Sequence, residues 1–417
     1  MYFAYNGVCE VNGYTTTYEP SGDPPAYSAG FVDKNKDIRD INAYGQNKWN
    51  LYKRYNRLLE KWGPYIMSFE DNERRSYIYR KPEERSQMLF DGQFMNEVFT
   101  YKPNIDGSAS AVSDPINDRF LQISFFTKHP WILPYTNPKS QYFMVTNRRC
   151  SPYYNNSSDD NIGGKRNVKV RISPFSLGFQ KFRNVSLLDL GRDSILTTFY
   201  NENNINSNYT LDLGWFNPGE AKLFKIAPAL SVGGTLVANE DIYNEEFTCD
   251  GQVNTNGKEV LFGDSTIINF SHSGNITVNG GTFACLANNY PAKFKGLNGQ
   301  FWGGVKIDNA SFGLINTVFE NTSGQAIYGI NSDVSLFDCI FNLNSRAIQF
   351  SNTGNTGKIA QIGNCKFNIT NTTSTNCNFL GSAAGMVNLY IDGNEFNTTS
   401  GSIALNINSG FGTVKKQ

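Results

Sequence analysis

The C-terminal part of the sequence carries an imperfect internal repeat, and this repeat limits the possible folds more than any other feature. Four segments align on one phenylalanine, at spacings of 22, 26 and 29 residues. They are Leu314–Thr322, Ser335–Asn344, Ala360–Thr370 and Leu389–Thr399, with the anchors Phe319, Phe341, Phe367 and Phe396. Self-similarity of this length is typical of architectures in which each repeat stacks on its neighbours.

Strand-like pieces and polar turns within a period in the low twenties predict a right-handed parallel β-helix. Each coil of such a fold holds about three short strands, and extra residues are accommodated in a turn. Gly274–Phe283 and Val305–Phe312 look like earlier, divergent coils. Leucine-rich repeats have a similar period, but leucine is too scarce at fixed positions here.

Asparagine and cysteine also recur in the repeats. Asparagine follows each anchor, at Asn321, Asn342, Asn368 and Asn397. We expect these side chains to form a ladder at the turns, because asparagine tolerates left-handed backbone. Cys339 and Cys365 both lie two residues before an anchor, which predicts stacked free thiols in the interior rather than a disulfide.

The composition changes near residue 230. Residues 1–230 hold 18 of the 22 tyrosines and 28 of the 37 basic residues, whereas residues 231–417 hold 9 basic and 13 acidic residues. This change predicts separate folding units, with a boundary near Pro228. The net charge of zero argues against nucleic acid as a partner, and no apolar run is long enough for a transmembrane helix.

Between residues 66 and 230 the sequence predicts an antiparallel β-sandwich. Short apolar or alternating segments are separated by turn residues such as Asn217-Pro218-Gly219. The clearest strands are Phe120–Phe126, Tyr142–Thr146, Val168–Ile172 and Ala221–Ile226. The absence of helical patterns between them favours antiparallel pairing over parallel crossovers.

One helix is predicted, from Tyr44 to Trp62, because apolar residues recur there at steps of three and four. Gly63-Pro64 is expected to end it. The intervening basic residues are expected to form a solvated face rather than a phosphate site. These are Lys48, Lys53, Arg54, Arg57 and Lys61. Residues 1–65 are interpreted as the remnant of a preceding barrel-like domain with its last helix, followed by domains at 66–230 and 231–417.

Several motifs resemble those of a known group of proteins. Tyr142–Ser151 (YFMVTNRRCS) and Gly214–Pro228 (GWFNPGEAKLFKIAP) are similar to strands of the β-sandwich that follows the catalytic barrel in secreted glycoside-hydrolase-like proteins. The region from Leu236 resembles the right-handed, pectin-lyase-like β-helix of large surface proteins of the Bacteroidota and Ignavibacteria. The resemblance implies an extracellular or cell-surface location, type IX secretion, and a carbohydrate-active enzyme elsewhere in the parent protein.

Catalytic residues can be named only as weak candidates. β-helix polysaccharide lyases resemble one another in using acidic residues that bind calcium, with a lysine or arginine as base. Asp308, Asp338, Asp392 and Lys306 match these residue types. A calcium site needs several carboxylates at one point, and scattered solvated acids explain these residues equally well. No cofactor is therefore predicted, except calcium if the chain is a lyase.

Glycan binding is the alternative chemistry, because exposed aromatic rings offer flat faces to sugars. The predicted contacts are Trp302, bracketed by glycines, and more weakly Tyr153, Tyr154 and Trp131. A core position would explain each of these residues as well. We therefore expect a monomeric, noncatalytic portion of a surface protein that binds a polysaccharide or cell-surface glycan, or that acts as a spacer. The alternative is a polysaccharide lyase or glycoside hydrolase that uses a face of the β-helix.

Overall fold

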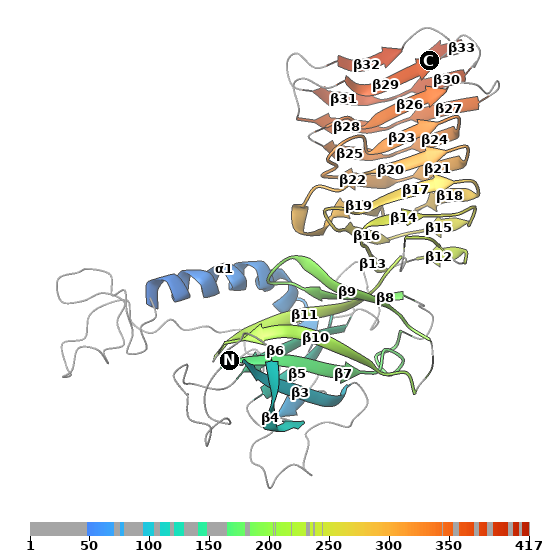
Figure 1. Cartoon of the computed structure of the whole chain (residues 1–417). Coiled ribbons are helices and arrows are strands. Elements are labelled where there is room, and N and C mark those ends of the chain that lie inside the picture. The colour runs from blue at the N-terminus through green and yellow to red at the C-terminus, as the bar shows by residue number, and fades with distance from the viewer. Residues whose placement is uncertain are drawn as a thin grey trace, which may run out of the picture.

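The computed structural model shows a mainly β protein in which antiparallel sheets precede a parallel β-solenoid (Figure 1). This architecture confirms the predicted fold class. The structure describes residues 48–70, 76–78, 95–103, 109–116, 121–128, 141–147, 165–179, 184–202, 204, 206–217, 219–230, 234–236, 238–243, 245–343, 345–352, 358–370, 375–381, 387–398, 403–407 and 411–416.

Two antiparallel sheets form the N-terminal part. Their strands are β1 (Phe69–Glu70), β2 (Ser76–Ile78), β3 (Met95–Pro103), β4 (Ala109–Ile116), β5 (Leu121–Lys128), β6 (Gln141–Asn147), β7 (Arg166–Ile172), β8 (Asn184–Asp189), β9 (Ser194–Tyr200), β10 (Tyr209–Phe216) and β11 (Ala221–Pro228). The larger sheet has the order β1-β5-β6-β11-β8-β9, with β2 beside β5, and the smaller has the order β10-β7-β3-β4. Strands β5, β6, β7 and β11 confirm the four clearest predicted strands.

The two sheets share one apolar interior. Phe143 of β6 and Phe224 of β11 are fully buried, and their rings stack at 5.2 Å between centroids. Val168 and Val170 of β7 belong to the same buried cluster. Each such side chain contributes about 1.5–3 kcal/mol by its burial. Alternate residues of each strand face this interior, as Phe143 and Val145 of β6 do, and their burial brings the sheets together as a sandwich.

The helix α1 (Lys48–Ile66) lies against the larger sheet. Trp62 is buried there, and Leu58, Tyr65 and Ile66 pack beside it. The predicted end at Gly63-Pro64 is wrong, since the helix runs to Ile66 with Pro64 inside its last turn. Proline removes one amide donor, but that turn is still held by the amide of Met67, which donates to the carbonyl of Gly63 at 2.9 Å.

The solenoid is built from three parallel sheets to which each coil adds one strand. The first sheet consists of β12 (Glu240–Ile242), β15 (Val260–Phe262), β18 (Thr282–Leu286), β21 (Ser311–Ile315), β24 (Asp333–Phe337), β27 (Lys358–Gly363), β30 (Val387–Asp392) and β33 (Phe411–Lys416). The second consists of β13 (Glu246–Cys249), β16 (Ile267–Phe270), β19 (Ala292–Gly296), β22 (Thr317–Glu320), β25 (Ile340–Leu343), β28 (Lys366–Ile369) and β31 (Glu395–Thr398). The third consists of β14 (Gln252–Asn254), β17 (Asn275–Asn279), β20 (Val305–Asp308), β23 (Ile327–Ile330), β26 (Ile348–Asn352), β29 (Thr375–Gly381) and β32 (Ile403–Ile407).

The anchor phenylalanines stack through the solenoid interior, as the repeat predicts. Phe341 pairs in register with Phe319 on one side and with Phe367 on the other. The ring centroids are 5.1 and 4.9 Å apart, and Phe396 continues the column at 4.8 Å. Phe294 of β19 extends the column one coil earlier. Parallel strands about 4.8 Å apart place equivalent side chains at this spacing.

Only part of the asparagine prediction is confirmed. Asn321 has a left-handed backbone (φ 59°), but Asn342, Asn368 and Asn397 lie on strands of the second sheet and point outward. There Asn368 Nδ2 donates to Asn342 Oδ1 at 2.8 Å, and Asn397 Nδ2 donates to Asn368 Oδ1 at 2.9 Å. The ladder exists, but it runs along a strand face. A column of left-handed turn residues instead lies three positions before the anchors, at Asn316, Asp338, Asn364 and Gly393.

Cys339 and Cys365 are buried free thiols, as predicted. They follow Asp338 and Asn364 of the turn column, so they occupy equivalent positions in adjacent coils. The Cys339 thiol lies 3.6 Å from the carbonyl oxygen of Leu314, and that of Cys365 lies 3.7 Å from the carbonyl oxygen of Leu336. These contacts satisfy the weak thiol donors within the interior.

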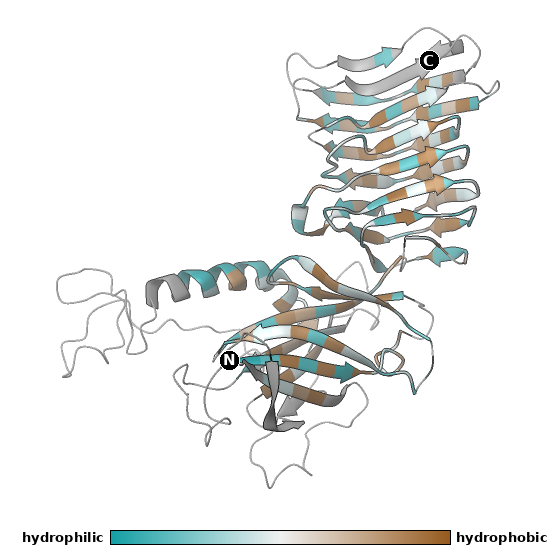
Figure 2. Cartoon of the chain, in the orientation of Figure 1, coloured by the Kyte–Doolittle hydropathy of each residue, from teal (hydrophilic) through white to brown (hydrophobic). Residues whose placement is uncertain are grey.

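The sandwich and the solenoid are joined by a continuous apolar core, and Figure 2 shows hydrophobic residues along the strands of both parts. One buried cluster extends from Val98 in the sandwich to Leu389 in the solenoid. The amide of Leu230, just after β11, donates to the carbonyl of Thr248 in β13 at 2.9 Å. The Thr248 hydroxyl donates to Ser186 Oγ of β8 at 2.8 Å. The solenoid thus begins directly on the sandwich.

Candidate functional site

The four weak catalytic candidates lie on different faces of the solenoid. Lys306 and Asp308 lie on β20 of the third sheet, where Lys306 Nζ pairs with Asp308 Oδ2 at 3.2 Å. Asp392 ends β30 in the first sheet, and Asp338 lies in the turn that follows β24 of that sheet. The structure therefore brings Lys306 and Asp308 together but separates them from the other two carboxylates.

Asp338 also has a structural explanation. Its φ of 55° places it in the left-handed turn column with Asn316 and Asn364. Aspartate and asparagine tolerate this backbone better than other side chains. Asp392 pairs in register with Gly363, which in turn pairs with Phe337, so two strand spacings separate Asp392 from the coil of Asp338. Two spacings correspond to about 10 Å along the solenoid axis.

Within the described ranges, no three histidine, cysteine, aspartate or glutamate side chains lie close enough to hold a metal ion. A calcium site needs several oxygen ligands at one point. Asp333, another acidic residue of the repeats, accepts hydrogen bonds from Lys358 Nζ at 3.3 Å and from the amide of Ile359 at 2.9 Å. Its oxygens are used to hold β27 against β24.

The predicted sugar contact at Trp302 is wrong. The side chain is completely buried, its ring stacks on Phe270 at 3.9 Å, and its Nε1 donates to the carbonyl of Glu320 at 2.7 Å. The neighbouring glycines serve backbone packing, because a Cβ at Gly304 would lie 2.1 Å from the carbonyl oxygen of Gln325. Tyr153, Tyr154 and Trp131, the other predicted contacts, lie outside the described residues.

Aromatic rings are nevertheless exposed on the first solenoid sheet. Leu286, Ile315 and Phe337 are consecutive partners in register, and Tyr243 occupies the same row two coils before Leu286. We call these four residues the outer apolar stripe. Tyr243, Leu286 and Phe337 are 46%, 56% and 37% exposed. The strand spacing gives the stripe a length of about 19 Å.

Glycines hold the two aromatic rings of this stripe close to the sheet. A Cβ at Gly263 would lie 1.8 Å from the ring of Tyr243, and a Cβ at Gly363 would lie 2.8 Å from the ring of Phe337. Each ring therefore occupies the space above the glycine of the next coil. An exposed ring supported in this way offers an apolar surface on which a sugar ring can stack.

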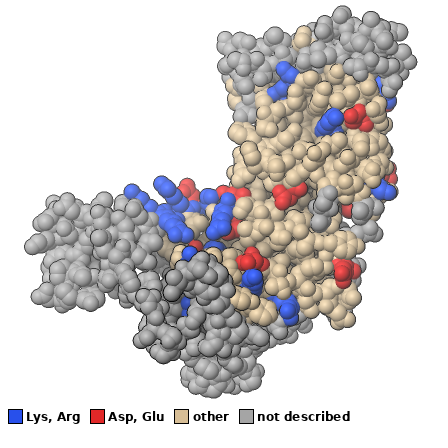
Figure 3. Space-filling model, viewed as in Figure 1, with Lys and Arg blue, Asp and Glu red and all other residues tan. Residues whose placement is uncertain are grey.

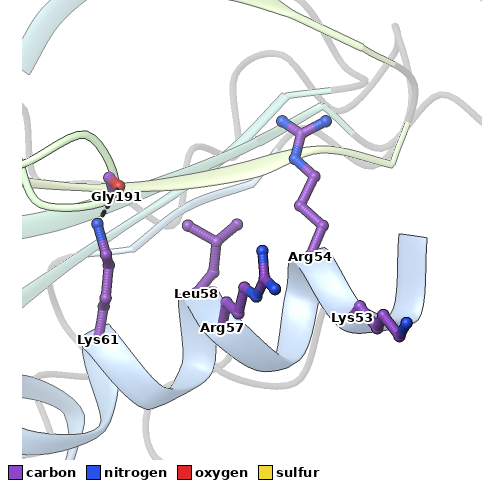
Figure 4. Close-up of a pocket in the computed structure, with 6 residues that line it drawn as sticks. All are labelled: Lys53, Arg54, Arg57, Leu58, Lys61 and Gly191. Atoms are coloured by element: carbon purple, nitrogen blue, oxygen red, sulfur yellow. Dashed lines mark hydrogen bonds between the residues drawn. The ribbon is translucent and has the colours of Figure 1, made fainter. Parts of the chain in front are cut away.

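A second surface feature is a groove of about 520 Å³ between α1 and the turn after β8. Four cations, Lys53, Arg54, Arg57 and Lys61, line it with Leu58 and Gly191 (Figure 4). We call it the basic groove. Lysine and arginine side chains gather over this part of the molecule, whereas charges are scattered on the visible face of the solenoid (Figure 3).

Arg54 and Lys61 tie α1 to the sandwich through ion pairs. Arg54 Nη2 pairs with Glu220 Oε1 at 3.2 Å, and Lys61 Nζ pairs with Asp193 Oδ2 at 2.6 Å. Asp193 also accepts hydrogen bonds from Asn298 Nδ2 and, through its carbonyl, from Gln300 Nε2 of the solenoid. The described cations of the predicted solvated face are exposed, as expected, and two of them also join α1 to the rest of the molecule.

Lys222, beside the basic groove, has a lowered pKa chiefly because it is buried. Burial lowers the pKa of Lys222 below its ordinary value of 10.5, and the charges of Arg192 and Arg54 lower the pKa further. Glu220 and Asp189 oppose this effect. Lys222 Nζ donates to the carbonyl of Trp215 at 2.8 Å and lies 4.3 Å from the centroid of the Phe216 ring. The lysine is thus held inside the sandwich edge rather than presented to a ligand.

Sequence reasoning missed both the stripe and the groove as surfaces. Every second residue of β18, β21 and β24 faces outward, so the apolar row could have been found by aligning strand ends instead of anchors alone. The spacing of Lys53, Arg57 and Lys61 by four residues was visible, but the opposing turn at Gly191 was not.

Comparison with known proteins finds no family model that matches the chain, and no matching curated protein or solved structure. In the part of the chain that the structure describes, no helix combines the length and apolar character that crossing a membrane requires.

Proposed function

We propose that this chain is a noncatalytic module of an extracellular or cell-surface bacterial protein, in which the solenoid acts as a rigid spacer on the sandwich. The observation that carries this proposal is the continuous core between the two parts. Flexible connections between domains have few crossing contacts. Here buried side chains, backbone hydrogen bonds and a buried ion pair cross the junction.

The placement of the weak catalytic candidates supports a noncatalytic role. Asp308 and Lys306 neutralise each other, and Asp338 has the backbone conformation of a turn residue. General acid–base cleavage of a glycoside requires two carboxylates on either side of one bond. A carbohydrate-active enzyme elsewhere in the parent protein, secreted by the type IX route, fits the motif resemblance of the sandwich and is proposed on that basis alone.

Glycan binding is a second proposed function, favoured by the outer apolar stripe. Tyr243 and Phe337 present exposed rings along one row, and polar side chains such as Gln361 lie in the neighbouring row. Sugars combine ring stacking with hydrogen bonds to hydroxyl groups. The stripe and the neighbouring row together provide both on an extended surface that a polymer can follow.

The test is to incubate the whole purified chain with a panel of plant and bacterial polysaccharides, with and without calcium. We expect retention on at least one glycan and no turnover. Ultraviolet-absorbing unsaturated ends would reveal a lyase, and new reducing ends without that absorbance a hydrolase; either result would overturn the noncatalytic role.

Variants then assign the retention to the stripe. Tyr243→Ala and Phe337→Ala should each weaken it by about tenfold, since stacking contributes about 1–1.5 kcal/mol per ring. Tyr200→Ala is the matched control, because Tyr200 is an equally exposed tyrosine (51%) on the sandwich. Equal retention by all three variants would remove the stripe as the binding surface.

A further inference from the structure

The basic groove has the charge pattern of a binding site for anions. Lys53, Arg57 and Lys61 are spaced by four residues, so they lie in one row along α1. Like charges at this spacing destabilise a helix. Two carboxylates, those of Glu220 and Asp193, pair with cations of the groove. Among the residues that the structure describes, neither carboxylate pairs with Arg57, so the groove keeps a positive charge at that position.

Arg57 is the cation best placed to contact a ligand. It lines the groove and is exposed, and it makes no ion pair or hydrogen bond with the residues that the structure describes. Figure 4 shows Arg54 and Lys61 extending toward the strands while Arg57 projects from the helix between them. Its guanidinium can form two parallel hydrogen bonds to a carboxylate or sulfate group.

The groove depends on a glycine. At Gly191 a Cβ would lie 3.2 Å from Leu58 Cδ2 and 3.3 Å from Asp189 Oδ1. The turn after β8 can therefore approach the helix closely, and Lys61 Nζ donates to the Gly191 carbonyl at 3.3 Å. Leu58 provides an apolar floor between the charged side chains, so the site combines apolar contact with peripheral cations.

We propose that the basic groove binds an anionic oligosaccharide through its carboxylate or sulfate groups. The proposal rests on the proposed glycan-binding function only in the choice of a sugar as ligand, since this site is separate from the outer apolar stripe. The row from Lys53 to Lys61 spans about 12 Å of helix axis. A linear sugar with several charged groups fits this length better than a single small anion.

The surroundings favour a sugar over nucleic acid. Among the lining residues that the structure describes, none is aromatic, whereas single-stranded nucleic acids stack their bases on aromatic rings. The chain has no net charge, and nucleic-acid binders show a basic excess. The volume of about 520 Å³ suits a small ligand or a short stretch of polymer.

The experiment measures binding of the whole chain to short oligogalacturonate and dextran sulfate, with neutral dextran and a short single-stranded DNA as comparators. We expect the anionic sugars to bind and their affinity to fall as salt is raised. Lys53→Gln combined with Arg57→Gln should weaken binding about tenfold or more, because hydrogen bonds to charged groups are among the stronger contacts. Arg57→Lys should retain part of the affinity.

Lys366→Gln is the matched control, since it removes one cation, 44% exposed, from the solenoid. The proposal is overturned if neither anionic sugar binds. It is also overturned if Lys366→Gln weakens binding as much as the double variant does. Tighter binding of the DNA than of either anionic sugar overturns the choice of ligand. The stripe variants Tyr243→Ala and Phe337→Ala do not alter the basic groove. If they lose retention of neutral glycans, binding of anionic sugars to the groove should be unchanged. Failure of the stripe proposal can therefore be told apart from failure of the groove proposal.

Discussion

Lys225 of β11 and Glu246 of β13 form an ion pair of 2.6 Å across the junction between sandwich and solenoid, with 3% and 15% of their side chains exposed. Lys225 Nζ also lies 5.4 Å from the centroid of the Tyr142 ring, and Glu246 Oε1 accepts a hydrogen bond from Asn269 Nδ2 at 2.7 Å. A charged pair in this position fixes the orientation of the first coil on the sandwich.

Removal of one partner of this pair should be strongly destabilising. Lys225→Ala leaves the carboxylate of Glu246 without its cation in a buried site, which costs about 3 kcal/mol in free energy of unfolding. The double change Lys225→Met with Glu246→Leu should recover most of that loss. Chemical unfolding of the three proteins checks this, and a single variant within about 0.5 kcal/mol of the parent protein would contradict it.

The close approach of the coils should make Gly304 irreplaceable. Its φ is +81°, and a Cβ would lie 2.1 Å from the carbonyl oxygen of Gln325. Gly304→Ala should therefore cost more than the 1–2 kcal/mol of a left-handed backbone alone, that is, about 3 kcal/mol. Gly313→Ala is the control, since a Cβ there meets no atom within 4 Å. Similar melting temperatures for the two variants would contradict the packing described.

The phenylalanine column should contribute more stability than the asparagine ladder beside it. Phe367 is fully buried between two stacked rings, so Phe367→Ala should cost about 3–5 kcal/mol. Asn368→Ala removes outward hydrogen bonds to two asparagines and should cost about 1 kcal/mol. Thermal unfolding of the two neighbouring variants compares them directly, and an equal loss would be inconsistent with an interior held by its rings.

Stability at acid pH should depend on Asp264. Hydrogen bonds from the backbone of Asn289, from its side chain and from the amide of Asn288 lower the pKa of this carboxyl group below 3.8. Because the folded-state pKa is the lower one, the ionised carboxylate stabilises the folded state above pH 3.8, and this contribution is lost as pH falls through the folded-state pKa. Unfolding followed from pH 6 to about pH 2 should show a shallower decline for Asp264→Asn than for the parent protein. An identical pH profile would remove this role.

The sequence predicts the solenoid well because its interior is periodic. The spacing of Phe319, Phe341 and Phe367 is set by the length of a coil, and this spacing is visible without coordinates. The turn column at Asn316 and Asp338 is equally periodic, but it mixes asparagine, aspartate and glycine, so no single residue type marks it. A repeated residue type alone does not say whether it turns the chain or faces outward from a strand.

Surface sites were harder to predict because they depend on contacts between distant segments. Trp302 has glycine neighbours and an aromatic ring, which suit a sugar contact, but its burial depends on Phe270 in the preceding coil. The basic groove requires the turn at Gly191 to meet Leu58 of α1. No local sequence pattern encodes contacts between residues so far apart in the chain. The residue types at these positions were therefore compatible both with a solvated or buried role and with ligand binding.

The most direct test of the spacer role is a distance measurement between the sandwich and the far part of the solenoid. Spin labels introduced through bio-orthogonal residues at the exposed positions Thr210 and Asp392 report this distance by pulsed electron resonance. A rigid junction predicts one narrow distance distribution in the parent protein. Lys225→Ala should broaden that distribution. A broad or two-peaked distribution in the parent protein would show that the solenoid moves freely on the sandwich, and would contradict the account.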